Sequence, residues 1–118
     1  MNTEKQSLQF ALKDYGLLSD GWDGIGSKAP LAEAVATAVG FVERLPSGTP
    51  LPKPMLSPSG EVGLYWDIGA IYADVTFAGG GAFSLFSRNR QADVETFIEG
   101  RLSEISAGQL GSLLSPLA

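Results

Sequence analysis

The segment GWDGIGSKAP, residues 21–30, has the residue types of a phosphate-binding loop. In such a loop, GxxxxGK[ST], the backbone holds the phosphates, the lysine reaches the terminal phosphates and the hydroxyl binds magnesium. Gly21 and Gly26 have the required spacing, but Ser27 precedes Lys28, so the two side chains stand in the wrong order. A helix, not a buried strand, is expected before the loop. The sequence therefore predicts no nucleotide binding here.

Carboxylates are the main acid–base groups of this chain. It has no cysteine and no histidine, which excludes thiol catalysis, imidazole triads and Cys/His zinc sites. Asp20 and Asp23 lack the spaced ligands of a calcium loop. Two carboxylates about 5–10 Å apart hydrolyse glycosides, and Glu61, Asp67 and Asp74 are candidates, but a small sheet offers them no deep cleft. We expect no enzyme, cofactor or metal; an enzyme that uses carboxylates on a small ligand or carbohydrate is the alternative.

The charge is acidic and evenly spread. The 13 acidic and 8 basic residues give a net charge of −5, without the basic footprint of a nucleic-acid-binding protein. No run approaches the ~18 apolar residues of a membrane-spanning helix, and residues 1–10 lack the apolar core of a signal peptide. These features favour a cytoplasmic protein with a protein partner and no membrane contact.

A first helix is expected from the N-terminus to Gly16. Thr3 and Gln6 match a capping box. Gly16 suits the left-handed residue after a helix, which would let Leu17 contact Leu12. The apolar residues of this helix recur every three or four positions and form one face: Leu8, Ala11, Leu12 and Tyr15.

A second helix is expected between Pro30 and Pro46, because proline is tolerated in a first turn and ends a helix later. The proline-rich residues 46–58 then form a stiff extended connection, and Pro58 to Gly60 form a turn. The expected apolar face of this helix is Leu31, Ala34, Val35, Ala38, Val42 and Leu45.

Residues 62–88 have a period of two, which indicates antiparallel strands joined by tight turns. The PMLS segment at 54–57 is predicted as an edge strand, where proline is tolerated. Residues 92–105 fit a strand by composition and a helix by spacing, and we favour the strand. The core side of the sheet is expected to carry Val62, Leu64, Trp66, Ile71, Val75, Phe77, Phe83 and Leu85.

Together these elements predict an α+β fold in one domain spanning residues 1–118. Two N-terminal helices would pack on an antiparallel meander of three to five strands. Ser106 and Gln109 form a second capping box, which starts a short C-terminal helix.

The turns also predict which residues lie opposite one another. A turn at Ile68–Gly69 would pair Tyr65 with Tyr72, and a turn at the three consecutive glycines would pair Tyr72 with Arg88. Tyrosine and arginine are enriched in binding hot spots. The side of the sheet away from the core is therefore our candidate contact surface, unless the C-terminal segment covers it: Tyr65, Tyr72, Asp74, Phe86 and Arg88.

The loop at residues 21–24 is predicted to be structural. Gly21, Gly24 and Gly26 allow tight bends. Trp22 is expected to fill the gap between helices and sheet, so its loss would cost about 3–5 kcal/mol. Asp23 is expected to accept backbone N–H groups.

Residues 15–78 resemble a group of small uncharacterised bacterial and phage proteins. Their pattern is a Gly-Trp-Asp-Gly loop, then a Pro-x-Gly turn into a strand that ends in tryptophan. The resemblance implies a setting in toxin–antitoxin or defence modules and assigns no activity. The very short hairpin after Asp67 departs from the pattern, so functions of a longer loop do not transfer. The matching residues are Leu18, Gly21, Trp22, Asp23, Gly24, Pro30, Pro58, Gly60, Glu61, Leu64 and Trp66.

We therefore expect a non-enzymatic protein-binding module. With the resemblance, it would be an inhibitor or antitoxin-like protein of a bacterial or phage defence or counter-defence system, anti-CRISPR-like proteins included. The partner would be a toxin, a nuclease, a defence complex or a second copy of the chain. A binder of single-stranded nucleic acid is a further alternative, because bases stack on exposed aromatic rings, but only Arg88 and Arg90 lie near them.

Overall fold

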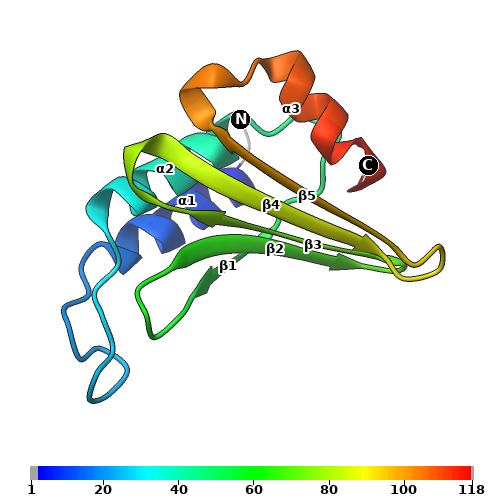
Figure 1. The fold of residues 1–118 in the computed structure, drawn as a ribbon. Coiled ribbons are helices and arrows are strands. Elements are labelled where there is room, and N and C mark those ends of the chain that lie inside the picture. Colours follow the sequence, from blue (N-terminus) through cyan, green and yellow to red (C-terminus); the bar gives the residue numbers. More distant parts are fainter. Residues whose placement is uncertain (1–2, 118) are drawn as a thin grey trace.

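The computed structural model describes residues 3–117, apart from the side chain of Ala107. It has the predicted α+β architecture: helices at the N-terminus, an antiparallel sheet and a short helix at the C-terminus (Figure 1). The elements are α1 (Thr3–Tyr15), α2 (Ala32–Glu43), β1 (Lys53–Leu56), β2 (Val62–Ile68), β3 (Ile71–Phe77), the 3₁₀ turn η1 (Gly79–Gly81), β4 (Ala82–Asn89), β5 (Val94–Arg101), the 3₁₀ turn η2 (Leu102–Glu104), α3 (Ala107–Leu114) and the 3₁₀ turn η3 (Ser115–Leu117).

The five strands form one sheet in the order β1-β2-β3-β4-β5, and each pairs with its neighbour in the antiparallel direction. The edge strand predicted at PMLS is β1. The ambiguous segment after residue 92 contains β5, because its β-branched and aromatic residues suit a strand. The helices of residues 3–117 all lie on one side of the sheet (Figure 1). We call that side the inner face and the opposite side the outer face.

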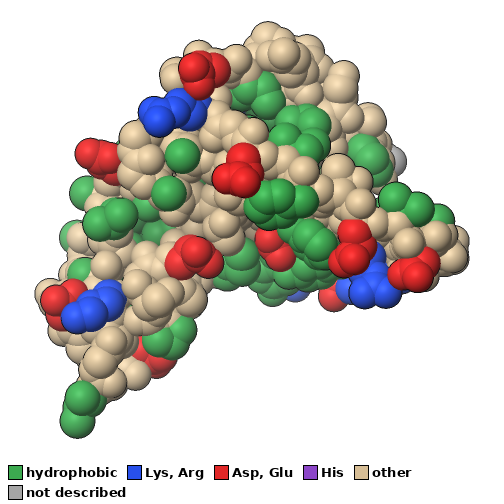
Figure 2. Space-filling view, viewed as in Figure 1, with side chains coloured by type: hydrophobic (Ala, Val, Ile, Leu, Met, Phe, Trp, Pro, Cys, Tyr) green, Lys and Arg blue, Asp and Glu red, His purple; other side chains and the backbone are tan. Residues whose placement is uncertain are grey.

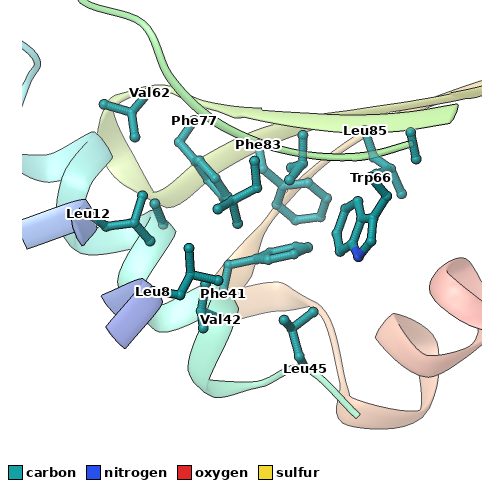
Figure 3. Packing of buried hydrophobic residues seen from close by; sticks show 14 of the residues in the cluster. Leu8, Leu12, Phe41, Val42, Leu45, Val62, Trp66, Phe77, Phe83 and Leu85 are labelled. Carbon is teal, nitrogen blue, oxygen red and sulfur yellow. The ribbon is translucent and has the colours of Figure 1, made fainter. Parts of the chain in front are cut away.

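The core lies between the helices and the inner face. The ring of Phe41 on α2 meets Phe77 at 5.4 Å and Phe83 at 5.9 Å, both edge to face (Figure 3). Trp66 is buried as predicted, and its indole N–H donates to the carbonyl of Pro50 at 2.7 Å. This bond attaches the proline-rich connection to the sheet.

The first helix ends differently from the prediction. Leu8 and Leu12 are buried as expected, but Gly16 is not among the glycines with positive φ. Its N–H instead donates to the carbonyl of Lys13 at 3.0 Å, so the last turn tightens to a 3₁₀ turn. Leu17 is 81% exposed and is not among the residues of the core cluster that contains Leu12.

The second helix buries a wider face than predicted. It starts at Ala32, two residues after Pro30, and Leu31 before it is extended and exposed. Phe41 and Thr37 are buried in addition to the predicted stripe. Phe41 packs against Phe77 and Phe83 of the sheet, and α2 as a whole contacts α1 and strands β2 and β3.

One hairpin register is wrong by two residues. The turn consists of Gly69 and Ala70, and Ile68 pairs with Ile71. Primed turns require positive φ at their first central residue, which glycine adopts (Gly69, φ 57°) and a β-branched isoleucine avoids. A shift of two residues keeps each side chain on its predicted face. The register of the next hairpin, which pairs Tyr72 with Arg88, is confirmed.

The C-terminal segment packs on the inner face. The Ser106–Gln109 capping box is formed, with both reciprocal bonds present. Leu110 and Leu114 are buried in the same cluster as the inner-face strands. Arg44 at the end of α2 donates hydrogen bonds to the carbonyls of Leu102 and Ile105, which holds the chain between β5 and α3. The C-terminal segment therefore does not cover the outer face.

Candidate functional site

The outer face carries two rows of side chains that run across the strands. Because α1, α2 and α3 all lie on the inner side (Figure 1), the side chains of these rows are half-buried or exposed. The first row is Lys53, Tyr65, Asp74, Phe86 and Phe97, and the second is Asp67, Tyr72, Arg88 and Glu95.

The structure brings the five predicted contact residues onto one surface, with one change of neighbours. Tyr65 lies opposite Asp74 and not opposite Tyr72, because of the corrected hairpin register. Phe97 was missed. It lies opposite Phe86 and is 62% exposed, and it extends the aromatic row onto β5.

Tyr72 is the most connected residue of the outer face. Its hydroxyl donates to Asp74 at 3.0 Å, and its ring lies 6.4 Å from that of Phe86. Burial raises the pKa of Tyr72, and the hydrogen bond to Asp74 with the charges of Asp74 and Asp67 raises it further. The hydroxyl therefore stays protonated, as a donor, at neutral pH.

Arg90, and not the Arg88 that lies opposite Tyr72, lies over the Tyr72 ring. The guanidinium carbon of Arg90 is 5.9 Å from the ring centroid, within cation–π range, and Arg90 also pairs with Asp67 at 2.8 Å. Arg88 turns away to pair with Asp93 at 2.9 Å. Asp93 has φ 55° in the turn between β4 and β5, which brings its carboxylate within reach of Arg88.

The charges left on the outer face after this pairing are three carboxylates and two cations, Lys53 and Arg101. The two arginines on this part of the sheet are neutralised by Asp67 and Asp93. Asp74 lies among the aromatic rings, and Glu95 and Glu99 stand exposed along β5. Such a surface repels phosphate and attracts basic groups.

The three candidate carboxylates of an enzyme are not brought together. Asp67 is paired with Arg90 and Asp74 accepts from Tyr72, whereas Glu61 lies before β2, at the other end of that strand. Within residues 3–117, no three carboxylates gather in a way that would hold a metal ion. Asp67 and Asp74 thus each have a polar partner on the outer face.

A hollow lined in part by apolar side chains lies on the opposite side of the sheet. It has a volume of about 470 Å³ and lies between β5 and α3, where apolar side chains reach the surface (Figure 2). Phe83, Ile98, Ile105 and Leu113 line it, and Glu99, Arg101 and Glu104 are its charged residues.

The Gly-Trp-Asp-Gly loop is a projecting structure and does not join the helices to the sheet as predicted. It extends away from the rest of the molecule (Figure 1), and Trp22 is only partly buried and outside the core cluster. Its indole N–H donates to the carbonyl of Lys28 at 2.6 Å, which closes the loop on itself. Gly21 and Gly24 have positive φ, as their expected role requires.

The polar contacts of this loop also differ from the prediction. The side chain of Asp20, not Asp23, accepts a backbone N–H, from Ala29 at 2.8 Å. Asp23 instead donates its backbone N–H to the hydroxyl of Ser27 at 3.0 Å, and that hydroxyl donates to the carbonyl of Gly24. Ser27 is buried within the loop. The residue types alone do not identify which of two aspartates reaches nine residues ahead.

A Trp22→Ala variant is therefore expected to lose about 1–2 kcal/mol of unfolding free energy, from one hydrogen bond and partial burial. Urea denaturation followed by circular dichroism measures this loss of unfolding free energy. The variant Trp66→Phe, at the buried tryptophan, is measured for comparison. A loss of 3 kcal/mol or more for Trp22→Ala would contradict the position of Trp22 outside the core.

In comparisons with known protein families, curated proteins and solved structures, the chain matches none of them. Within residues 3–117, no helix is long and apolar enough to cross a membrane.

Proposed function

We propose that the protein acts by binding another protein through the outer face of its sheet, without catalysing a reaction. The observation that carries this proposal is the uncovered row of Tyr65, Asp74, Phe86 and Phe97, beside Tyr72. Aromatic residues with a polar partner are typical of the centres of protein interfaces.

Pre-ordering of the row supports the same function. Tyr72 is held by Asp74 through its hydroxyl and by Phe86 and Arg90 through its ring. A side chain that is already fixed in the free protein loses little conformational entropy when a partner binds. Strands also position these residues more rigidly than a loop would.

The charge of the surface indicates the chemistry of the partner. Arg88 and Arg90 are paired with Asp93 and Asp67, which leaves Asp74, Glu95 and Glu99 in excess over Lys53 and Arg101 on the outer face. We therefore propose a partner surface with basic side chains around an apolar centre. A protein that itself binds nucleic acid, such as a nuclease, offers such a surface. An inhibitor or antitoxin-like role in a defence or counter-defence system, anti-CRISPR-like roles included, agrees with this chemistry and with the resemblance.

The test is a Phe86→Ala variant, whose affinity for the partner is expected to fall by about 2 kcal/mol, roughly 30-fold. The partner is captured from cells of the source organism with the wild-type chain, and binding is then measured by calorimetry with purified components. Phe10→Ala is the matched control, because Phe10 is equally apolar and 65% exposed but lies on α1.

Equal affinity of the Phe86→Ala and wild-type chains would place the binding surface elsewhere. Salt-dependent binding of single-stranded oligonucleotides that Phe86→Ala abolishes would favour the nucleic-acid alternative. The melting temperature of Phe86→Ala should stay close to that of wild type, because Phe86 lies outside the core cluster.

A further inference from the structure

The two edges of the sheet differ in how well they are protected. At one edge β1 is short and contains Pro54, which has no N–H to donate, next to Lys53. Prolines and lysines of this kind block pairing with another strand. At the other edge β5 runs from Val94 to Arg101 without a proline, and its register with β4 is unbroken over that length. Within residues 3–117, no strand pairs with its second edge.

The first half of β5 is exposed on both faces of the sheet. Val94 and Thr96 point to the inner face, yet both are exposed, and Glu95 and Phe97 are exposed on the outer face. The exposed fractions of Val94 and Phe97 are 55% and 62%. The second half differs, because Ile98 and Gly100 are half-buried beside the hollow under α3. The first half is thus the more exposed, although Val94 and Thr96 border a hollow with Pro116, and the second half borders the hollow of about 470 Å³.

We infer that β5 pairs with β5 of a second copy of this chain. Two identical strands in antiparallel pairing are related by a two-fold axis perpendicular to the sheet. The inner faces of the two copies then lie on the same side of the joined sheet. Such an axis must pass through a residue that faces itself. The pairing between the two copies of β5 is longest when the axis passes through Phe97 or through Ile98, near the middle of the strand.

The charges on β5 select between these two axes. An axis at Phe97 places Glu95 opposite Glu99 of the second copy, twice, and like charges directly opposite are destabilising. An axis at Ile98 places Glu95 opposite Arg101 of the second copy, twice, as two attractive pairs. The inferred dimer therefore has Ile98 on its axis.

The same register brings the exposed half of each strand beside the half that borders the hollow in the other copy. Thr96 lies opposite Gly100 of the second copy, which lines the hollow of about 470 Å³. Val94, one step further along the inner face, lies opposite Leu102 of the second copy, the residue that follows β5. The pairing thus places the exposed first half of β5 beside a second strand.

This inference does not depend on the proposed function. It uses the edge of β5, whereas the proposed partner contacts the outer face. The dimer forms from the purified chain alone, so its failure would leave the partner-binding test unaffected, and the reverse is also true. The two surfaces share Glu95, Phe97 and Glu99, which lie on the outer face of β5.

Single cysteines test the register, because the chain has no cysteine of its own. Directly opposite residues have Cα atoms about 4.5–5.5 Å apart, which a disulfide spans. Under mild oxidation, Ile98→Cys is expected to form covalent dimers faster than Phe97→Cys, although position 97 is the more exposed. Equal or faster cross-linking of Phe97→Cys would overturn the register.

A charge exchange tests the dimer without a cross-link. Sedimentation equilibrium of the full chain over a range of concentrations is expected to show a monomer–dimer equilibrium. Glu95→Arg or Arg101→Glu alone should weaken the dimer by about tenfold or more, since each change makes two repulsive pairs. The double variant Glu95→Arg, Arg101→Glu should restore the dimer. A dimer lost because the single variants fold poorly would not be restored in this way. A wild-type chain that stays monomeric, or a double variant no better than the single ones, would overturn the inference.

Discussion

Replacing Phe41 with alanine is expected to lower the free energy of unfolding by about 3–5 kcal/mol. Phe41 is fully buried, and its ring packs edge to face against Phe77 and Phe83 (Figure 3). The substitution removes the side chain that joins α2 to the third and fourth strands. The cavity that remains is bounded by sheet residues that cannot collapse onto it easily. Urea denaturation monitored by circular dichroism measures the loss.

The control for this prediction is Phe10→Ala on the neighbouring helix. Phe10 is 65% exposed, so the same change of residue type should alter stability by less than about 0.5 kcal/mol. Similar losses for the two variants would mean that Phe41 is not at the centre of the core.

The order of the helices and strands follows from local patterns, which is why the sequence predicts it. Apolar and polar residues alternate over residues 62–88 when each strand buries one of its faces, and β2, β3 and β4 each do so. The predicted stripe of α2 omits Phe41, although Phe41 lies three residues after Ala38 and seven after Ala34, on the same helical face. Its ring packs on the sheet, against Phe77 and Phe83.

The sequence predicts which residues lie on the outer face, but it does not predict every pair that lies side by side there. Alternation alone places Tyr65 and Tyr72 on the same side of the sheet, and this side survives a register shift of two residues. Which of them lies beside Asp74 depends on the φ of one turn residue, Gly69. Phe97 could have been predicted as well, by extending the residue pairing from the fourth strand through the turn after Arg90 to the fifth.

The role of the loop could not be predicted from its own residues. Trp22 has the size of a core anchor, but its burial depends on whether the loop folds back onto the sheet. The structure shows that the loop is held instead by residues about thirty positions later. The N–H of Lys28 donates to the carbonyl of Pro58 at 2.8 Å. This contact joins the Gly-Trp-Asp-Gly loop and the Pro-Ser-Gly turn into one structural unit.

Gly60 is the residue that permits this contact. Its φ is 88°, in the region that favours glycine, and the N–H of Gly60 donates to the carbonyl of Ser57 at 2.9 Å. A Cβ atom at this position would lie 2.7 Å from the carbonyl oxygen of Ala29 and 3.2 Å from that of Lys28. Both neighbours are backbone atoms, so neither can move without displacing the loop.

A Gly60→Ala variant is therefore expected to lose about 2–4 kcal/mol of unfolding free energy, from the left-handed backbone and from the overlap with the loop. Gly69→Ala is the matched control, because Gly69 also has positive φ but no atom within 4 Å of its added Cβ. It should lose only about 1–2 kcal/mol. Thermal and urea denaturation of both variants give the comparison. Equal losses would mean that the turn does not support the loop, whereas a larger loss for Gly60→Ala, with increased protease cleavage within residues 20–29, would show that this contact holds the loop in place.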